Sequence, residues 1–403
     1  METYAAINSN LERSNVSPSV KKDKILTQFA IIKENVQLNV INESLGKTPL
    51  RFYTEFINEN IYHNIKYVST SEDYIGRFYG EFMSYSGSGQ KLGIVLTPKH
   101  ITELFCELLD LEPDDIILDP CCGTGSFLVA AMHYMVKKAK KNGMDDDDID
   151  DIKKNHFFGI EQRADMFTIA TTNMILRGDG NSKLINDDFL SRNAAKIQLD
   201  QPTVGIMNPP YSQGTKEKPE QYEISFVEHL LDSLVNDGKS KCAVIVPLSA
   251  MVGKTIEEEI VKKNILDKHT LEGVITLNGN TFYPVGTMPC IALFTAGKPH
   301  PSKKVCKFID FSDDGYEVQR HKGLVKTESA DDKKQHLLDV WFDRIDAPNN
   351  FCVKSTIDYK EEWLHDYYYF NDEIPTAEDF DQKVGDYLSF EFNALMANRS
   401  IVK

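Results

Sequence analysis

The sequence predicts a doubly wound α/β fold, in which a parallel sheet carries helices on both faces. Between residues 91 and 299, short runs rich in β-branched and aromatic residues alternate with longer stretches of helical spacing, which is the pattern of a sheet with crossover helices. A glycine-rich turn, Asp119 to Gly125, follows the first of these runs, at the edge where such sheets bind ligands. The seven predicted strands are Ile116–Asp119, Phe157–Glu161, Lys183–Asp187, Val204–Asn208, Cys242–Pro247, Leu271–Leu277 and Cys290–Thr295.

The segments on either side of this domain have different patterns. Residues 1–90 are predicted to form a small helical domain, because apolar residues recur there at mixed helical spacing. The run Ser86-Gly87-Ser88-Gly89 predicts a flexible joint at its end. After one strand-like run, Val305–Phe311, residues 300–403 become acidic and rich in aromatic residues. We therefore expect a catalytic domain over 91–299 and a mixed or helical extension over 300–403, a candidate subunit-contact region.

The composition is that of a globular protein without disulfides or metal. Of the 403 residues, 41% are hydrophobic and 26% are charged, ordinary values for a chain with a sizeable core. The seven cysteines form no C-x-x-C pair, and the ten histidines show no metal-ligand spacing. No apolar run is long enough to cross a membrane, and the polar amino-terminal stretch does not resemble a signal peptide. We expect a cytoplasmic protein with no metal site and no membrane segment.

The net charge limits how the chain could bind nucleic acid. It holds 45 basic and 61 acidic residues, a formal charge of −16. Because basic side chains supply most of the non-specific affinity for DNA, either these residues are gathered on one face or another polypeptide supplies much of the binding.

The turn Asp119-Pro120-Cys121-Cys122-Gly123-Thr124-Gly125 predicts a cofactor site. Gly123 and Gly125 let the backbone turn sharply and approach a ligand, and we expect a bulky side chain at Gly125 to block the pocket. The third glycine of a dinucleotide fingerprint is replaced by Leu128, and no G-K-[ST] follows, so no phosphate-binding loop is predicted. An ordinary strand-to-helix turn is the alternative.

Acidic residues at the ends of the next two predicted strands extend this site. Glu161 ends the second strand, where a carboxylate can accept hydrogen bonds from ribose hydroxyls. An adenosine without phosphates is consistent with S-adenosylmethionine as cofactor. After the third strand, Asp188 could reach the adenine amine, and Asp187 is an equally near candidate.

The fourth predicted strand ends in Asn208-Pro209-Pro210-Tyr211, a stiff turn that we predict to be catalytic. Two consecutive prolines fix the backbone and leave carbonyls without competing N–H groups. The Asn208 side-chain oxygen and the Pro209 carbonyl could hold both N–H groups of a planar exocyclic amine, which favours methyl transfer to that nitrogen by positioning. Tyr211 offers a ring on which an extruded base can stack. A Pro-Pro turn with an asparagine cap is the structural alternative.

A second methyl-transfer chemistry is suggested by Pro289-Cys290, because a cysteine after proline can act as the nucleophile for methylation of a cytosine carbon. Cys290 begins an apolar run that is predicted to be a buried strand, so a core cysteine is the favoured interpretation.

Together these motifs resemble the adenine-N6 DNA methyltransferases, and among them the modification subunits of type I restriction systems. The resemblance implies the Rossmann-like, seven-stranded fold of S-adenosylmethionine-dependent methyltransferases. It covers residues 73 to 294 in the order of the family. The similar stretches are Asp73–Phe82, Gly93–Phe105, Asp119–Leu128, Gly159–Glu161, Asn208–Tyr211 and Asn280–Phe294.

The resemblance also implies residue roles. Ile94–Lys99, including Thr97, Pro98 and Lys99, would lie along the methionine part of the cofactor. Phe282 falls where the family places a second aromatic residue against the base, and Tyr283 competes for that role. The turn would line the cofactor through Asp119, Gly123, Thr124, Gly125 and Ser126. Glu161 would hold the ribose, and Asn208 and Tyr211 would bind the target base.

The partners that the resemblance implies are DNA and a separate specificity subunit, with a second copy of the chain and a restriction subunit as further possibilities. This division agrees with the acidic charge and with the lack of a recognisable DNA-reading domain after residue 299. Two other functions are kept open: methyl transfer to protein glutamine or another planar amine, and a non-catalytic assembly role in a restriction system.

Overall fold

The computed structural model of the chain describes residues 32–62, 96–177, 183–320, 322–371 and 376–396, together with positions 9, 26, 27, 29 and 30. These residues fall into two compact units, one within Met1–Tyr368 and one within Tyr369–Lys403. The predicted joint at Ser86–Gly89 and the stretch Asp73–Phe82 lie outside the described residues.

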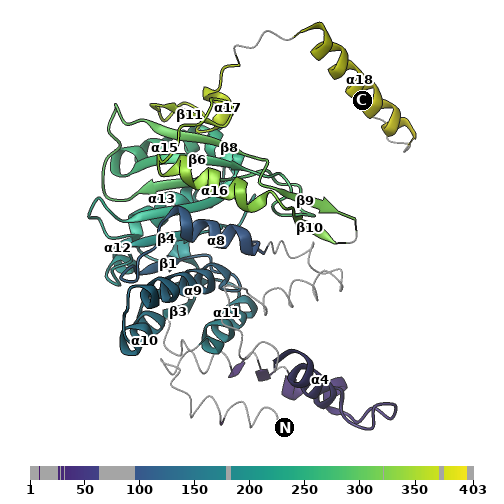
Figure 1. Cartoon of the computed structure of the whole chain (residues 1–403). Coiled ribbons are helices and arrows are strands. Elements are labelled where there is room, and N and C mark those ends of the chain that lie inside the picture. Colours follow the sequence, from purple (N-terminus) through teal and green to yellow (C-terminus); the bar gives the residue numbers. More distant parts are fainter. Residues whose placement is uncertain are drawn as a thin grey trace. The chain divides into compact units, whose positions relative to one another are not determined.

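A mostly parallel sheet forms the centre of the first unit (Figure 1). In the described part of the chain this sheet has nine strands in the order β11-β8-β6-β7-β5-β4-β1-β2-β3. Their bounds are Ile117–Asp119 for β1, Phe157–Glu161 for β2, Lys183–Asn186 for β3, Val204–Met207 for β4, Lys241–Pro247 for β5, Thr270–Leu277 for β6, Pro289–Thr295 for β7, Cys306–Phe311 for β8 and Cys352–Ser355 for β11.

The predicted strands are all present, but two features of the sheet differ from the prediction. Strands β8 and β11 extend the sheet past β6, because β8 pairs parallel with β6 and β11 pairs antiparallel with β8. Strand β7 runs antiparallel to both β5 and β6. The chain returns from β6 to β7 through residues 278–288, all of them described, which contain no helix to make a parallel crossover.

Helices cover both faces of the sheet, because successive side chains of a strand point to opposite sides. Ile117 packs in one cluster with α8, α9, α10, α11 and α16, whereas Leu118 packs in the other with α12, α13, α14, α15 and the segment at α17. Figure 1 shows α16, α8 and α9 beside one another on one face. The helices are α8 (Lys99–Leu108), α9 (Ser126–Lys141), α10 (Asp146–Asn155), α11 (Ala164–Leu176), α12 (Ala194–Gln198), α13 (Glu223–Ser233), α14 (Leu248–Val252), α15 (Ile256–Lys268), α16 (Ala330–Trp341) and α17 (His365–Tyr368).

Other described elements are two 3-10 helices, Phe189–Ser191 and Pro219–Gln221, and elements near the two ends of the chain and in a small hairpin. In the predicted helical region they are α3 (Val36–Asn39), α4 (Pro49–Ile57) and a π-helical turn at Asn58–Tyr62. Strands β9 (Tyr316–Gln319) and β10 (Gly323–Lys326) form an antiparallel pair. Helix α18 (Ala377–Met396) belongs to the second unit. No helix in the described ranges is long and apolar enough to span a membrane.

The division of the chain at residues 90 and 300 stays a prediction. Strands β8 and β11 and helices α16 and α17 come from beyond residue 299, yet they join or cover the same sheet. Residues of the extension therefore complete the core of the sheet domain.

The strand order creates a binding edge at β1. The chain passes from β1 to β2 and β3 on one side, and β4 then pairs with β1 on the other side. Such a reversal leaves a crevice beyond the carboxyl ends of the strands. Asp119, Glu161 and Met207 are the last residues of β1, β2 and β4, so the two predicted motifs meet at this crevice.

Candidate active site

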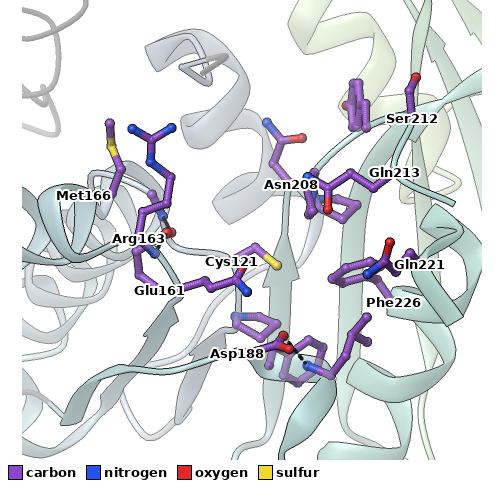
Figure 2. A pocket seen from close by; sticks show the side chains of 18 of the residues that line it. Cys121, Glu161, Arg163, Met166, Asp188, Asn208, Ser212, Gln213, Gln221 and Phe226 are labelled. Carbon is purple, nitrogen blue, oxygen red and sulfur yellow. Dashed lines mark hydrogen bonds between the residues drawn. The ribbon is translucent and has the colours of Figure 1, made fainter. Parts of the chain in front are cut away.

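A cavity of about 500 Å³ lies where the turn after β1 meets the turn after β4. Figure 2 shows Glu161, Arg163 and Met166 on one side of it and Asn208, Gln213 and Phe226 on the other, with Cys121 and Asp188 between them. The volume is in the range of pockets that hold a small-molecule cofactor. Residues that are far apart in the sequence therefore share one site.

The glycine turn after β1 approaches this cavity through Gly123. Gly123 lines the cavity and has a left-handed backbone, with φ of 54°. Gly125 also has a positive φ, 82°, but it is not among the lining residues, and an added Cβ would meet Ala170 of α11 at 3.5 Å. The expectation that a bulky side chain at Gly125 blocks the pocket stays a prediction. Substitution there would strain the start of α9, because L side chains rarely adopt that backbone conformation.

Glu161 ties the ends of β1 and β2 together. Its Oε2 atom accepts a hydrogen bond from the Gly123 backbone N–H at 2.9 Å, and its Oε1 atom accepts one from the Arg163 backbone N–H at 2.7 Å. Burial raises the pKa of this carboxyl, although the two backbone hydrogen bonds oppose the rise. Each oxygen of a carboxylate has two lone pairs, so both can still accept from a ligand hydroxyl in the cavity.

Asp119, the last residue of β1, is a buried carboxyl with spare hydrogen-bonding capacity. Its Oδ1 atom accepts from the Cys121 backbone N–H at 3.2 Å, while its Oδ2 atom has no hydrogen-bond partner among the described residues. Only 1% of the residue is exposed. Burial raises the pKa of Asp119 to about 8, so the protonated form is favoured when no cation is near.

This raised pKa predicts a particular pH dependence of stability. The unfolded carboxyl has a pKa of about 3.9, so between about pH 4 and pH 8 the folded protein holds a proton that the unfolded chain has lost. The free energy of unfolding then falls as the pH rises through this window, by at most ~1.4 kcal/mol per pH unit. Asp119→Asn keeps the shape and cannot ionise. The melting temperature of this variant minus that of the wild type should therefore increase from about pH 5 to pH 8 in thermal unfolding without cofactor; a constant difference would contradict the assigned protonation.

The two aspartates after β3 have different partners, although both line the cavity. Asp187 pairs with the Arg192 guanidinium at 2.7 Å through Oδ2, and its Oδ1 atom accepts from the Asp188 backbone N–H at 2.9 Å. Among the described residues, Asp188 is hydrogen-bonded through Oδ1 alone, which accepts from the Leu190 backbone N–H at 3.1 Å. Asp188 therefore has the more available carboxylate oxygen.

The clamp after β4 is oriented by a residue from another motif. The side-chain Nδ2 of Asn208 donates to the Thr97 hydroxyl oxygen at 3.1 Å. This contact uses the donor end of the Asn208 amide and leaves its Oδ1 atom to accept. Asn208, Pro209, Pro210 and Tyr211 all line the cavity, and their role as acceptors for an amine stays a prediction.

Tyr211 and the residue after it are fixed by three contacts. Its hydroxyl donates to the Ile245 carbonyl at 3.3 Å, and burial raises its pKa well above the usual value. Its ring meets that of Phe282 edge to face, with centroids 6.1 Å apart. The next residue, Ser212, has a positive φ of 59°, and its N–H donates to the buried Glu223 carboxylate at 2.6 Å. These contacts fix the ring that was predicted to stack on a base.

Several predicted residues lie beside the cavity without lining it. Phe282 is 3% exposed behind Tyr211, and Tyr283 is 51% exposed; their part in base stacking stays a prediction. Thr97 reaches the site through Asn208, and the Thr124 carbonyl accepts from Asn173 Nδ2 at 2.8 Å. Pro98, Lys99 and Ser126 occupy the starts of α8 and α9, while residues 94 and 95 lie outside the described ranges.

The cavity also includes side chains that the sequence did not predict. Arg163 and Met166 lie just after Glu161, so their closeness to that motif was a usable signal. Gln221 and Phe226 come from the turn before α13 and from α13 itself, and no sequence pattern pointed to them. Leu96, from the predicted stretch Ile94–Lys99, also lines the cavity. The lining residues absent from the prediction include Gln162, Arg163, Met166, Phe189, Leu190, Ser212, Gln213, Gln221, Phe226, Val285 and Thr287.

The cysteines do not offer a competing chemistry. All seven lie in described positions and are free thiols. Cys290 is fully buried in β7, and burial raises its pKa, so it is a core residue and not a poised nucleophile. In the part of the chain that the structure describes, no group of three or more His, Cys, Asp or Glu residues could hold a metal ion.

The chain shares its fold with solved methyltransferase structures, among them a putative class I S-adenosylmethionine-dependent methyltransferase from Listeria monocytogenes, which aligns with a TM-score of 0.50 and 17% sequence identity, covering 85% of this chain and 99% of that one. The structure of the type I restriction enzyme EcoKI M protein has this fold. It aligns with a TM-score of 0.54 and 15% sequence identity, covering 98% of this chain and 95% of that one.

The sequence comparison is more specific than the fold. The model of the family N-6 DNA Methylase matches residues 70–367, and the chain belongs to this family. It is 44% identical over 392 residues to the type II restriction enzyme and methyltransferase RM.BcgI of Heyndrickxia coagulans, covering 97% of this chain and 60% of that protein. It is 25% identical over 253 residues to the type I restriction enzyme EcoEI methylase subunit of Escherichia coli, covering 60% of this chain and 50% of that subunit. The chain thus spans little more than half the length of these relatives.

Proposed function

We propose that the protein transfers a methyl group from S-adenosylmethionine to the N6 amine of adenine in DNA, as the modification part of a restriction-modification system. The observation that carries this proposal is the contact between Asn208 and Thr97 at the wall of the cofactor-sized cavity. Because Nδ2 of Asn208 donates to Thr97, the Oδ1 atom of Asn208 is left to accept from a ligand. The family match and the names of the relatives support it.

The residues of the cavity fit S-adenosylmethionine. Glu161 has acceptor capacity for ribose hydroxyls, and Asp188 has an oxygen available for the adenine amine. The Oδ2 atom of Asp119, which has no hydrogen-bond partner among the described residues, offers a buried polar atom near the glycine turn. When bound, the cofactor supplies the activated methyl group. The chain holds it through Gly123, Glu161 and Asp188, and we assign Thr97, Pro98, Lys99, Asp119, Thr124, Gly125 and Ser126 to the frame around these residues.

Catalysis by the clamp is mainly positioning. An exocyclic amine is a weak nucleophile, because its lone pair is delocalised into the base. Asn208 Oδ1 and the Pro209 carbonyl accept its two N–H groups and present the lone pair to the methyl group, which lowers the barrier by orientation. Tyr211 stacks against an adenine that has left the helix. No covalent bond forms between the protein and the base.

The charge supports a division of labour with other chains. With a formal charge of −16, the protein has little net attraction for the DNA backbone. We therefore propose a separate specificity subunit, with a second copy of the chain and a restriction subunit as further partners. Two relatives are named as restriction-enzyme components. The expected location is the cytoplasm, where cellular DNA would be accessible.

The function is tested by offering two substrates. The protein, with any DNA-recognition partner encoded beside it, is incubated with methyl-labelled S-adenosylmethionine and either unmethylated genomic DNA or a protein extract. We expect label in DNA, in adenine. Label in protein alone would favour the glutamine alternative, and failure to bind the cofactor in calorimetry would favour a non-catalytic role.

The Thr97 contact predicts a contrast between two substitutions. Thr97→Val keeps the side-chain shape and removes the hydroxyl, so the Asn208 amide is no longer oriented. A lost neutral hydrogen bond is worth about 0.5–1.5 kcal/mol, and the rate constant of methyl transfer should fall by about threefold to tenfold. Thr97→Ser keeps the hydroxyl and should retain most of the rate in single-turnover assays. Equal rates for both variants would show that the hydroxyl does not orient Asn208.

A further inference from the structure

The loop that carries Phe282 is built on one asparagine. Asn278 is the first residue after β6, and its carbonyl accepts from both the Thr281 N–H at 2.9 Å and the Thr281 hydroxyl at 2.7 Å. Its Oδ1 atom accepts from the Asn280 N–H at 2.9 Å. These bonds form the turn that ends at Thr281. The residue after it, Phe282, meets Tyr211 edge to face.

The same asparagine is anchored to a part of the chain beyond the seven predicted strands. Its Nδ2 atom donates to Asp314 Oδ1 at 2.8 Å and to the Tyr316 carbonyl at 2.9 Å. Asp314 Oδ1 also accepts from the Tyr316 N–H at 2.9 Å. Asn278 is 8% exposed and Asp314 is 3% exposed, so water does not compete freely for these bonds.

Asp314 also faces His100, at the start of α8. Its Oδ2 atom lies 3.9 Å from His100 Nε2, and neither atom has a hydrogen-bond partner within the described ranges. The His100 ring stacks on Tyr316 with centroids 3.9 Å apart. His100 follows Thr97 by three residues, and Thr97 orients Asn208. The contacts of Asp314 therefore connect the elements that hold Tyr211 and Asn208.

We propose that Asn278 and Asp314 are positioning residues for methyl transfer, which hold the β6–β7 loop so that Phe282 backs Tyr211. This role rests on the proposed function. Neither side chain lines the cavity, so they act through Phe282 and Tyr211. We call the hydrogen-bonded pair Asn278–Asp314 the anchor. Glu161 ends β2 and Asp188 follows β3, so cofactor binding should not depend on the anchor.

A charge exchange across the anchor tests this role. Asn278→Asp places a second carboxylate against Asp314 and removes the donor, so the loop should separate from Asp314. Asp314→Asn can keep an acceptor toward Asn278 and turn its NH₂ group to the His100 nitrogen, so it should lower kcat much less than Asn278→Asp does. In the double variant Asn278→Asp/Asp314→Asn the donor and acceptor are exchanged, and the bond should partly re-form.

Three measurements are made on the full chain with any DNA-recognition partner: kcat and KM for DNA, cofactor affinity, and the ¹⁹F resonance of Phe282 in protein labelled with fluorophenylalanine. That resonance is assigned with Phe282→Leu. For Asn278→Asp we expect kcat to fall about 10-fold to 100-fold, the loss typical of a small misplacement. Its cofactor affinity should be unchanged and its Phe282 resonance shifted or broadened. The double variant should recover part of both changes.

The outcomes separate the two proposals. An unchanged kcat in Asn278→Asp, a parallel loss of cofactor affinity, or a double variant no better than Asn278→Asp would overturn the positioning role. Wild-type protein that binds the cofactor but methylates no DNA would contradict the proposed function. The Phe282 resonance would still show whether the anchor holds the loop, and an unmoved resonance in Asn278→Asp would overturn the anchor itself.

Discussion

Replacement of Asn208 by alanine is expected to lower the rate constant of methyl transfer by about a hundredfold to a thousandfold, the range seen when one preorganised polar group is removed from a reacting centre. The variant loses the amide whose donor end is held by Thr97 and whose acceptor end is available at the cavity wall. The target amine would then keep only one acceptor, the Pro209 carbonyl. Cofactor binding should survive, because Gly123, Glu161 and Asp188 are untouched.

The measurement is single-turnover methylation of DNA, with cofactor affinity determined by calorimetry on the same sample. Asn142→Ala is a matched control, because Asn142 is an exposed residue just after α9 and does not line the cavity. Turnover by Asn208→Ala at the level of this control would contradict the role of the clamp. A loss of cofactor affinity together with turnover would place Asn208 in the cofactor site instead.

Replacement of Glu161 by glutamine should weaken cofactor binding by about tenfold to a hundredfold, because a hydrogen bond to a charged group contributes about 1.5–3 kcal/mol. The Glu161 carboxylate accepts from the Gly123 and Arg163 N–H groups, one on each oxygen. A glutamine has a single acceptor oxygen, so its NH₂ group must face one of these donors. The turn after β1 or the turn after β2 would then move away from the ribose.

Calorimetric titration with S-adenosylmethionine and with its demethylated product measures this loss. Glu328→Gln removes the same charge at an exposed position outside the cavity and serves as control. Affinity of Glu161→Gln equal to that of the control would show that Glu161 only shapes the turn.

The parts of the fold that were predictable are those encoded locally. Each of the seven predicted strands is an apolar run bounded by polar or turn residues, and the observed bounds lie within one residue of the prediction. Strand β11 was missed because Cys352–Ser355 is short and exists through its pairing with β8. The direction of β7 depends on what connects it to β6, because the described residues 278–288 contain no helix that could form a parallel crossover.

The same distinction holds for the site. Glu161 and Asn208 were found because each ends a predicted strand, and the ends of neighbouring strands meet at one edge. Gly123 lines the cavity and Gly125 does not, a difference in backbone direction that the motif does not contain. The contact between Thr97 and Asn208 joins residues 111 positions apart, and Asn278 and Asp314 meet only through the strand order. Such pairs follow from the tertiary structure and not from local pattern.

The most direct test of the central claim is to map modified bases in DNA from cells that lack adenine methylation. These cells express the chain together with its neighbouring genes, either as wild type or as Asn208→Ala. We predict N6-methyladenine at a defined set of sites in the wild-type cells and none at those sites in the variant cells. Unmodified adenine throughout the wild-type DNA, or equal methylation in both strains, would contradict an adenine-N6 methyltransferase that acts through the Asn208 clamp.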